Sequence, residues 1–143
     1  MLDRQQILRL IPHQGASCLL GAMLSWSADG ILCNARSHLD QGNALRRAGR
    51  LRTICGAEYG LQAAALHGAL LGGGRAQLAG YLVSLRDVAI GTERLDDAAH
   101  GTLEIEAKRV RQDAGSLIYA FRLVSEAGRC LLSGRAAIVL NDG

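Results

Sequence analysis

Apolar residues dominate one long segment of the chain, residues 54–71, which reads ICGAEYGLQAAALHGALL. Its strongly polar side chains are Glu58, Gln62 and His67. A helix over this segment would be apolar on every side, which is typical of a helix inside a core. Its 18 residues would span about 27 Å, the width of a small domain. We therefore predict a buried central helix with Thr53 as its N-cap and Gly72-Gly73-Gly74 at its end.

Alternation of apolar and polar residues predicts strands on both sides of this helix. Upstream, residues 17–26 and 31–36 flank Asp29-Gly30, a strong hairpin turn. Downstream, strands are predicted at residues 80–90, 102–111, 116–125 and 129–140. The phase slips at Arg109-Val110, which indicates a β-bulge. Residues 80–90 alternate little, so we expect both faces of that strand to be covered.

Two further segments complete the order of elements. Residues 3–10 predict a short helix with Asp3 as its N-cap, and Pro12 stops it. The polar residues 38–52 predict an irregular loop. Residues 1–143 then form one α+β domain, in which a strongly curled antiparallel sheet wraps the central helix. Such a sheet leaves its edges open, so a partner subunit is expected.

The composition narrows the class of protein. With 49% hydrophobic and 20% charged residues, the 143-residue chain is expected to fold around one core. The net charge of +3 is small, and basic residues are not interleaved with aromatics, so no nucleic-acid partner is expected. The N-terminus lacks the apolar stretch of a signal peptide, and no apolar run approaches a membrane span. We expect a cytoplasmic protein without a membrane partner.

The cysteines give no sign of a metal centre. Cys18, Cys33, Cys55 and Cys130 are scattered through apolar stretches. They form no Cys-x-x-Cys pair and no Cys/His cluster with metal-ligand spacing. We expect reduced, structural thiols, and neither a metal nor a cofactor.

Glu58 is the most informative residue of the central segment. A carboxylate in an apolar helix costs several kcal/mol if it stays charged and unpaired, so such residues usually cap, pair or perform chemistry. Capping is natural near a helix start, and Gln62 at i+4 is placed to hydrogen-bond with Glu58. Free backbone amides near Cys55 and Gly56 would polarise a carbonyl, since Gly56 has no side chain to block approach.

Histidines and arginines are the other candidates. His67 lies on the face opposite Glu58 and is interpreted as a core or interface residue. His13 has either a structural or a direct catalytic role. His38 and His100 lie in predicted loops without a paired motif. The arginine run, Arg46, Arg47, Arg50 and Arg52, is either a solvated face or a site for a phosphate or an acidic partner.

Three stretches resemble the hot-dog-fold β-hydroxyacyl-acyl-carrier-protein dehydratases, and most of all those of aryl-polyene-type clusters. IPHQGASCLLGAML (11–24) is similar to the family's Leu-Pro-His and first strand, and GAEYGLQAAALHG (56–68) is similar to its Gly-x-Glu-x-x-x-Gln helix motif. GYLVSLRDVAIGTERLDD (80–97), followed by GTLEIEAKRV, resembles the third strand and meander. Together these stretches cover nearly the whole chain in the family's order.

The resemblance implies a hot-dog fold and site roles. In the family, a helix glutamate works with a loop histidine across a dimer interface, and helix-start amides hold the thioester carbonyl. Glu58 matches that glutamate, Gly56 the amide position and Gln62 the helix glutamine. Ala48 stands where the loop histidine is expected, and His13 matches a different, N-terminal histidine of the family.

The resemblance also implies the chemistry to test. The expected activity is dehydration of a 3-hydroxyacyl thioester carried by acyl carrier protein or coenzyme A, impaired if Ala48 leaves the site without its base. The alternatives are an acyl thioesterase with Glu58 activating water, or a non-catalytic partner of an active homologue. A homodimer and a heterodimer with a homologous hot-dog subunit both remain open. The arginine run would suit an acidic carrier protein and its phosphopantetheine phosphate.

Overall fold

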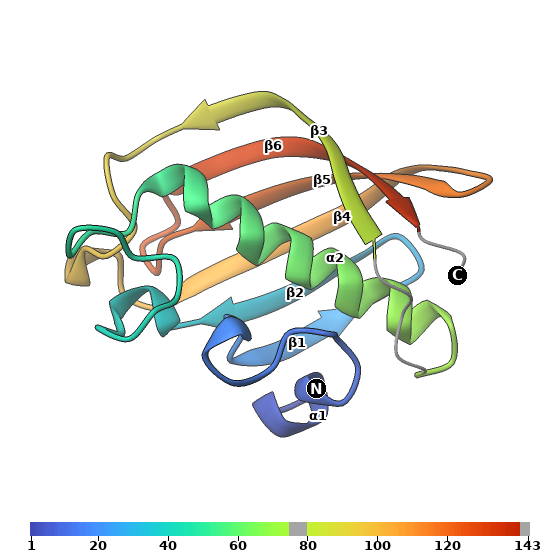
Figure 1. The fold of residues 1–143 in the computed structure, drawn as a ribbon, viewed down its shortest axis with the longest axis horizontal. Coiled ribbons are helices and arrows are strands. Elements are labelled where there is room, and N and C mark those ends of the chain that lie inside the picture. The colour runs from blue at the N-terminus through green and yellow to red at the C-terminus, as the bar shows by residue number, and fades with distance from the viewer. Residues whose placement is uncertain (75–79, 141–143) are drawn as a thin grey trace.

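Six antiparallel strands form one curled sheet, and the helix α2 (Ala57–Leu71) lies along one face of it (Figure 1). The computed structural model describes residues 1–74 and 80–140. The strands are β1 (Ala22–Trp26), β2 (Gly30–Ala35), β3 (Gly80–Ile90), β4 (Leu103–Asp113), β5 (Ser116–Val124) and β6 (Cys130–Leu140). Their order across the sheet is β1-β2-β4-β5-β6-β3. This arrangement confirms the predicted α+β architecture of a sheet around a central helix.

Helix α2 is as deeply buried as its composition predicts. Nine of its side chains or glycines are buried: Ala57, Tyr59, Gly60, Gln62, Ala63, Ala64, Leu66, His67 and Ala69. The helix packs mainly against β4, β2 and β5. At Gly60 a Cβ would lie 2.7 Å from the Phe121 ring, so only glycine lets the helix approach β5 this closely. The helix ends at Leu71 with Gly72 as its C-cap, as predicted.

The helix start differs from the prediction. Thr53–Gly56 forms a 3-10 turn, and α2 begins at Ala57 with Gly56 as its N-cap. The Thr53 hydroxyl does not cap the helix but donates to the carbonyl of Thr92 at 2.8 Å. That bond ties the turn to the segment that follows β3, which no local pattern in the sequence could indicate.

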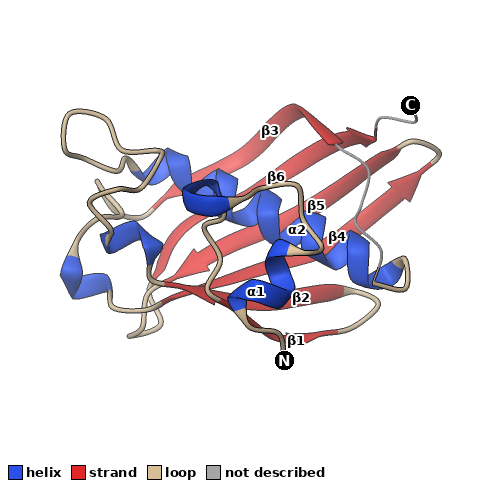
Figure 2. Ribbon diagram, turned by 60° about the horizontal axis from the view of Figure 1, so that its bottom comes forward, coloured by secondary structure: helices blue, strands red, loops and turns tan. Residues whose placement is uncertain are grey.

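The N-terminal region covers the side of the sheet that carries α2 (Figure 2). Helix α1 (Arg4–Leu8) has the predicted Asp3 N-cap, and Gln6 completes a capping box. The first strand, predicted from residue 17, begins only at Ala22. A 3-10 turn at Gly15–Ser17 precedes it. The alternation at residues 17–21 therefore reflects packing onto the core rather than a strand.

The meander after the helix agrees with the sequence pattern except at β3. A register shift between Arg109 and Arg111 confirms the bulge in β4. Strand β3, however, is an edge strand that pairs only with β6 among the described strands. Its apolar side chains Leu82, Val83, Val88 and Ile90 are 38–63% exposed. The prediction that both faces of this strand are covered is wrong for this chain alone.

The remaining expectations concern cysteines, metals and membranes. All four cysteines are free thiols: Cys18 and Cys33 are buried, Cys55 is partly buried and Cys130 is exposed. Across residues 1–74 and 80–140, no three His, Cys, Asp or Glu side chains cluster in a way that suits a metal ion. Within the same ranges, no helix is both long and apolar enough to cross a membrane.

Candidate functional site

Glu58 occupies the first turn of α2 and is partly buried. Within the described residues its carboxyl group accepts no hydrogen bond and forms no ion pair, although carboxyl groups near a core normally find partners. The helix dipole favours a negative charge at this end. The structure therefore places one unengaged acid at the start of the central helix.

Gln62 does not pair with Glu58 as predicted. Its Oε1 accepts the backbone N–H of Leu19 at 2.8 Å, and its Nε2 donates to the carbonyl of Ser17 at 2.7 Å. Both ends of a side chain that is 1% exposed are thus used to hold the segment before β1. Gln62 is a structural anchor, and the prediction of a Glu58–Gln62 hydrogen bond is wrong.

The backbone amides at the helix start are also more engaged than predicted. The N–H of Cys55 donates to the carbonyl of Arg52 at 3.0 Å, so it is not free to bind a ligand. A Cβ at Gly56 would lie 2.8 Å from Leu123 Cδ2 and 2.9 Å from Leu132 Cδ2. Glycine is therefore needed at this position for packing against the sheet, and the predicted open approach to its amide is not what requires it.

Ala48 lies at an exposed turn in the loop before the helix. Arg47 and Arg50 exchange two backbone hydrogen bonds, of 2.9 and 3.0 Å, around Ala48 and Gly49. Both central residues have positive φ, 53° and 73°, which is the signature of a two-residue turn of the I′ type. A non-glycine residue rarely adopts this conformation. The position that the resemblance assigns to a catalytic histidine thus presents a methyl group at a strained turn.

The four histidines fall into different environments. His13, weighed as a catalytic residue, is partly buried, and its Nδ1 is buried without a hydrogen-bond partner among the described residues. His38 is fully buried, and neither ring nitrogen has a partner within the same part of the chain. That burial lowers the pKa of His38 to about 4. His100 Nε2 lies 3.0 Å from the carbonyl of Arg94, and no hydrogen bond between described residues joins a histidine to Glu58.

His67 is the core residue that the sequence predicts. Its Nε2 donates to the carbonyl of Ser27 at 2.8 Å, so its Nδ1 accepts from the Tyr119 hydroxyl at 2.7 Å. Arg109 Nε in turn donates to that hydroxyl at 3.0 Å. Burial lowers the pKa of His67, which keeps the imidazole neutral at physiological pH.

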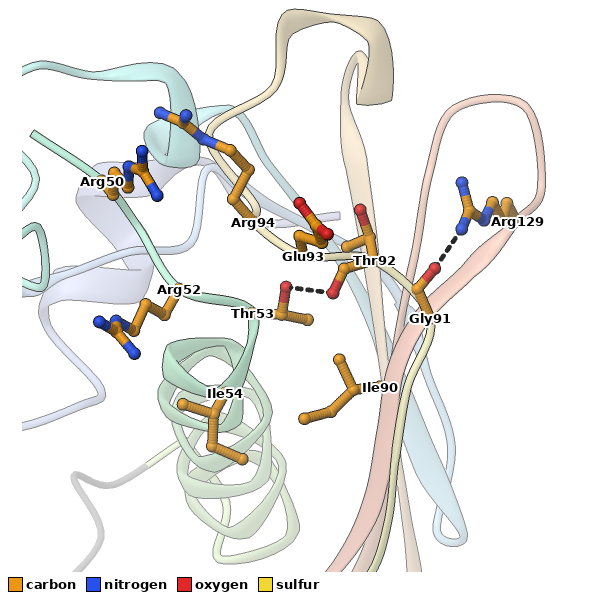
Figure 3. Close-up of a pocket in the computed structure, with 10 residues that line it drawn as sticks. All are labelled: Arg50, Arg52, Thr53, Ile54, Ile90, Gly91, Thr92, Glu93, Arg94 and Arg129. Atoms are coloured by element: carbon orange, nitrogen blue, oxygen red, sulfur yellow. Dashed lines mark hydrogen bonds between the residues drawn. The ribbon is translucent and has the colours of Figure 1, made fainter.

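A pocket of about 950 Å³ opens beside the helix start (Figure 3). Its wall comes from the 3-10 turn, the end of β3 and the loops around them: Arg50, Arg52, Thr53, Ile54, Ile90, Gly91, Thr92, Glu93, Arg94 and Arg129. Ile54 and Ile90 face each other across its lower part, while arginines rim its upper part (Figure 3). Glu58 is not part of this wall. The pocket and the acid are neighbouring features of the helix start rather than one cavity.

The structure divides the predicted arginine run in two. Arg46 donates to the carbonyls of Asp40 and Gly49 and pairs with Asp96 at 3.2 Å, and its side chain is 10% exposed. Arg47 donates to the carbonyls of Ala44 and Arg46. Both therefore help to hold the loop together, and neither lines the pocket. Exposed Arg50 and Arg52 line the pocket instead.

Sequence reasoning missed the other residues of the pocket. Arg94 and Arg129 add two cations from segments about 40 and 80 residues beyond the run. Asp96 lies behind them, where Arg94 Nε donates to its Oδ1 at 2.8 Å and Arg46 to its Oδ2. The hydrogen bonds of Arg94, together with that of the Leu51 backbone N–H, hold the pKa of Asp96 well below its usual range. The only local signal was an Arg-x-Asp spacing after a predicted strand, which is too common to indicate a site.

Solved structures with the same fold include dehydratases and thioesterases. The chain is similar to the dehydratase heterocomplex ApeI:P from Xenorhabdus doucetiae, with a TM-score of 0.79, 17% identity, and coverage of 95% of this chain and 91% of that one. For AziG from S. sahachiroi the TM-score is 0.60 at 17% identity, covering 82% and 88%. A hypothetical thioesterase with coenzyme A from Streptococcus pneumoniae TIGR4 gives 0.60 at 14% identity, covering 83% and 84%. These likenesses confirm the hot-dog fold.

Comparison of sequences defines the family. Among curated proteins, none matches the chain. The family model of the ApeP-like proteins, described as ApeP dehydratase, matches residues 5–142. That match spans the helix motif around Glu58, the loop around Ala48 and the whole sheet, so the resemblance drawn from the sequence is confirmed. The chain belongs to the ApeP-like dehydratase family.

Proposed function

We propose that this chain is one subunit of a 3-hydroxyacyl-thioester dehydratase, in which Glu58 acts on the substrate and a homologous hot-dog subunit supplies the histidine. The observation that carries the proposal is the division of the expected pair. Glu58 is present, partly buried and unengaged within the described residues, whereas the histidine position is Ala48 at an exposed turn. A lone carboxyl group provides half of a general acid–base pair, so the other half must come from elsewhere.

The chemistry assigned to Glu58 follows from its place. Dehydration of a 3-hydroxyacyl thioester requires a base to remove the proton next to the thioester carbonyl and an acid to protonate the leaving hydroxyl. A single carboxyl group at a helix start is suited to assist loss of the hydroxyl, while a neutral imidazole of the partner would take the proton.

The edge strand β3 is the surface we assign to the partner. Its exposed apolar side chains, Leu82, Val83, Val88 and Ile90, and its unpaired edge would expose apolar surface and free backbone groups in a monomer. Ile90 also lines the pocket beside the helix start, so a subunit on this edge would lie next to the site. A dehydratase heterocomplex is found in the similar ApeI:P structure, which favours a heterodimer over a homodimer here.

We further propose that the substrate arrives on acyl carrier protein. The rim of the pocket carries Arg50, Arg52, Arg94 and Arg129 against one acid, Glu93. Such a rim attracts an acidic protein surface and the phosphate of a phosphopantetheine arm. Arg46 has no part in this role because its side chain is largely buried and is bound to Asp96 and to backbone carbonyls. Arg47 does not line the pocket.

The test is a dehydration assay with a 3-hydroxyacyl thioester, followed by formation of the enoyl product. The chain is assayed alone and with a homologous hot-dog subunit that has an intact histidine loop. We expect little turnover alone and turnover in the mixture that falls at least about 10²-fold with Glu58→Gln. The matched control is Glu104→Gln, which changes an exposed acid on β4 between the buried Leu103 and Ile105. Equal turnover with Glu58→Gln and wild type would mean that the chain is a non-catalytic partner.

A thioesterase of the same fold is the second candidate. It is favoured by one observation, namely that no histidine is hydrogen-bonded to Glu58 among the described residues, since a carboxyl group alone is sufficient to activate water for hydrolysis. The same assay separates the two activities, since hydrolysis releases a free thiol and dehydration leaves the thioester intact. Release of thiol by the chain alone, abolished by Glu58→Gln, would replace the dehydratase proposal.

A further inference from the structure

We infer that the pocket of Figure 3 is a phosphate-binding site whose arginines are oriented by Asp96, a positioning residue that lies behind its wall. The inference rests on the proposed function for the identity of the ligand, the phosphate of a phosphopantetheine arm. It goes further by assigning the site to Arg94, Arg129 and Asp96, none of which the arginine run of the sequence includes.

The pocket holds more cations than acids, even though Arg94 is paired with Asp96 behind the wall. Arg52 and Arg94 lie directly opposite each other in an antiparallel bridge. Like charges at such positions repel and destabilise the pairing. Arg50 and Arg129 line the same pocket, where the Arg129 guanidinium also donates to the carbonyl of Gly91, and Glu93 is the one acid in the wall. A bound phosphate would neutralise this repulsion and accept charge-assisted hydrogen bonds from several guanidinium groups.

Asp96 fixes the guanidinium of Arg94. The side chain of Asp96 is 2% exposed, and its two oxygens accept from Nε and Nη2 of Arg94. This two-point contact uses one edge of the guanidinium and sets its plane. The remaining Nη1 makes no hydrogen bond within the described residues, and the Arg94 side chain is 42% exposed. Arg94 is thereby held rigidly with a free donor at the rim of the pocket.

The same carboxylate fixes the opposite wall. Its Oδ1 accepts the backbone N–H of Leu51 at 3.1 Å, and Leu95 N–H donates to the carbonyl of Leu51 at 2.9 Å. Leu51 lies between Arg50 and Arg52, so the backbone that carries these two arginines is set by Asp96 as well. One buried acid therefore orients cations on two segments that are about 40 residues apart in sequence.

The lower part of the pocket suits the chain attached to the phosphate. Ile54 and Ile90 are 42% and 58% exposed and face each other below the arginines (Figure 3). Water beside two exposed isoleucines is readily displaced by an apolar or amide-containing arm. An arginine rim above apolar walls thus fits a phosphate ester with a linear organic arm better than it fits a flat acidic protein surface.

The experiment compares 4′-phosphopantetheine with pantetheine, which differ only by the phosphate, in calorimetric titrations of the full chain. We expect the phosphorylated probe to bind at least about tenfold more tightly, which is the value of a charge-assisted contact. Arg94→Gln and Arg129→Gln should remove this preference. Arg111→Gln, which changes an exposed arginine on β4 outside the pocket, should leave it intact. Equal binding of both probes to wild type would overturn the inference and would point to a carrier-protein surface instead.

The role of Asp96 is tested by whether Asp96→Asn tightens or weakens the binding of 4′-phosphopantetheine. Asp96→Asn removes a negative charge near the anion, so electrostatics alone would tighten binding of the phosphorylated probe. If Asp96 positions Arg94, the variant should show the opposite result: its affinity for 4′-phosphopantetheine should fall about tenfold, and its affinity for pantetheine should not change. Should Asp96→Asn fail to fold, Arg94→Lys keeps the charge at the rim but loses the two-point contact. Unchanged or tighter phosphate binding in the folded variants would overturn the positioning role.

The phosphate site and the dehydratase function can each be disproved without disproving the other. A dehydratase that shows turnover but no preference for the phosphorylated probe would retain its function and lose this site. A chain that shows the phosphate preference without turnover in any mixture would retain the site and lose the catalytic proposal.

Discussion

The two ends of helix α2 both bring polar side chains against the core, but only one end satisfies them. Near Leu71, His67 is bonded to Ser27 and Tyr119, and Arg109 completes the chain of hydrogen bonds. Near Ala57, Glu58 has no partner within the described residues, and the neighbouring arginines face a pocket. A satisfied buried network stabilises a fold, whereas a partly exposed acid without a partner in the chain is available to a ligand or another subunit.

Protonation at the far end strengthens this contrast. Burial lowers the pKa of His67 and raises the pKa of Tyr119, so both groups are neutral at pH 7. Neutral partners in a low-dielectric environment cost little desolvation, and each hydrogen bond there contributes to stability. Polar residues in one apolar helix can therefore have either a structural or a functional role, and burial alone does not distinguish the two.

The largest expected effect is at the helix start. Glu58→Gln should lower the dehydration rate of the assembled enzyme by about 10²–10⁴-fold, because it removes a proton-transfer group. Since the carboxyl group has no partner to lose within the described residues, the free energy of unfolding should change by less than about 0.5 kcal/mol. Steady-state kinetics and urea titration of the same samples measure both quantities. A loss of stability as large as that of a core variant would identify Glu58 as structural and remove the contrast.

Tyr119→Phe should produce the reverse pattern. The hydroxyl donates to His67 and accepts from Arg109, so its loss leaves a buried imidazole nitrogen and a partly buried guanidinium N–H without this partner. We expect a decrease of about 1–3 kcal/mol in the free energy of unfolding, measured by urea titration at pH 7. Activity per folded molecule should stay within a factor of about two, because the network is at the opposite end of the helix from Glu58. A wild-type-like unfolding curve would show that the network contributes no stability.

Most of the fold could be predicted from the sequence because local patterns of apolar residues indicated which elements and faces lie in the core. The apolar segment 54–71 had to lie in a core, and the alternation in residues 116–125 correctly assigned the buried face of β5, with Leu117, Tyr119, Phe121 and Leu123 inside. The place of β3 could not be read in this way. Its apolar composition resembles that of an interior strand, and only the crossover that pairs it with β6 puts it at an edge.

The candidate site was predictable only in its local part. Glu58 stood out because a carboxyl group interrupts an apolar helix, and that signal is local. Gln62 was assigned to Glu58 by helical spacing, but its actual partners, Ser17 and Leu19, are more than 40 residues away. The role of Arg46 was misjudged for the same reason, since its partner Asp96 lies 50 residues further along the chain.

The third prediction is that the folded protein loses stability as the pH falls, because of the buried His38. Buried His38 has a pKa of about 4 in the folded protein, against about 6.5 when unfolded. Between these values the unfolded chain binds a proton that the folded chain does not, so stability falls as the pH falls. From pH 6 to pH 5 the expected loss through His38 is about 1 kcal/mol, measured by thermal or urea unfolding.

The variant His38→Leu separates this effect from that of His67. Leucine has a similar volume and leaves no unpaired nitrogen, so it should flatten the pH dependence and maintain stability at pH 7. The remaining slope would report on His67, whose pKa is also lowered by burial. An unchanged slope in His38→Leu would mean that His38 is accessible to protons in the folded protein.

The smallest expected effect tests whether the arginine cluster is strained in the absence of an anion. Arg52→Gln removes one of two like charges that lie opposite each other at the Arg52–Arg94 bridge, so it should raise the unfolding temperature by about 1–2 °C at low ionic strength. In about 1 M sodium chloride the gain should vanish, because charges at the surface are screened beyond about 3 Å. Addition of 4′-phosphopantetheine should reverse the order, since only wild type retains the full rim and gains stability from binding. A lower melting temperature for Arg52→Gln without any anion would mean that Arg52 is also stabilised by contacts inside the chain, as Arg94 is by Asp96, and the two ends of the helix would no longer differ in kind.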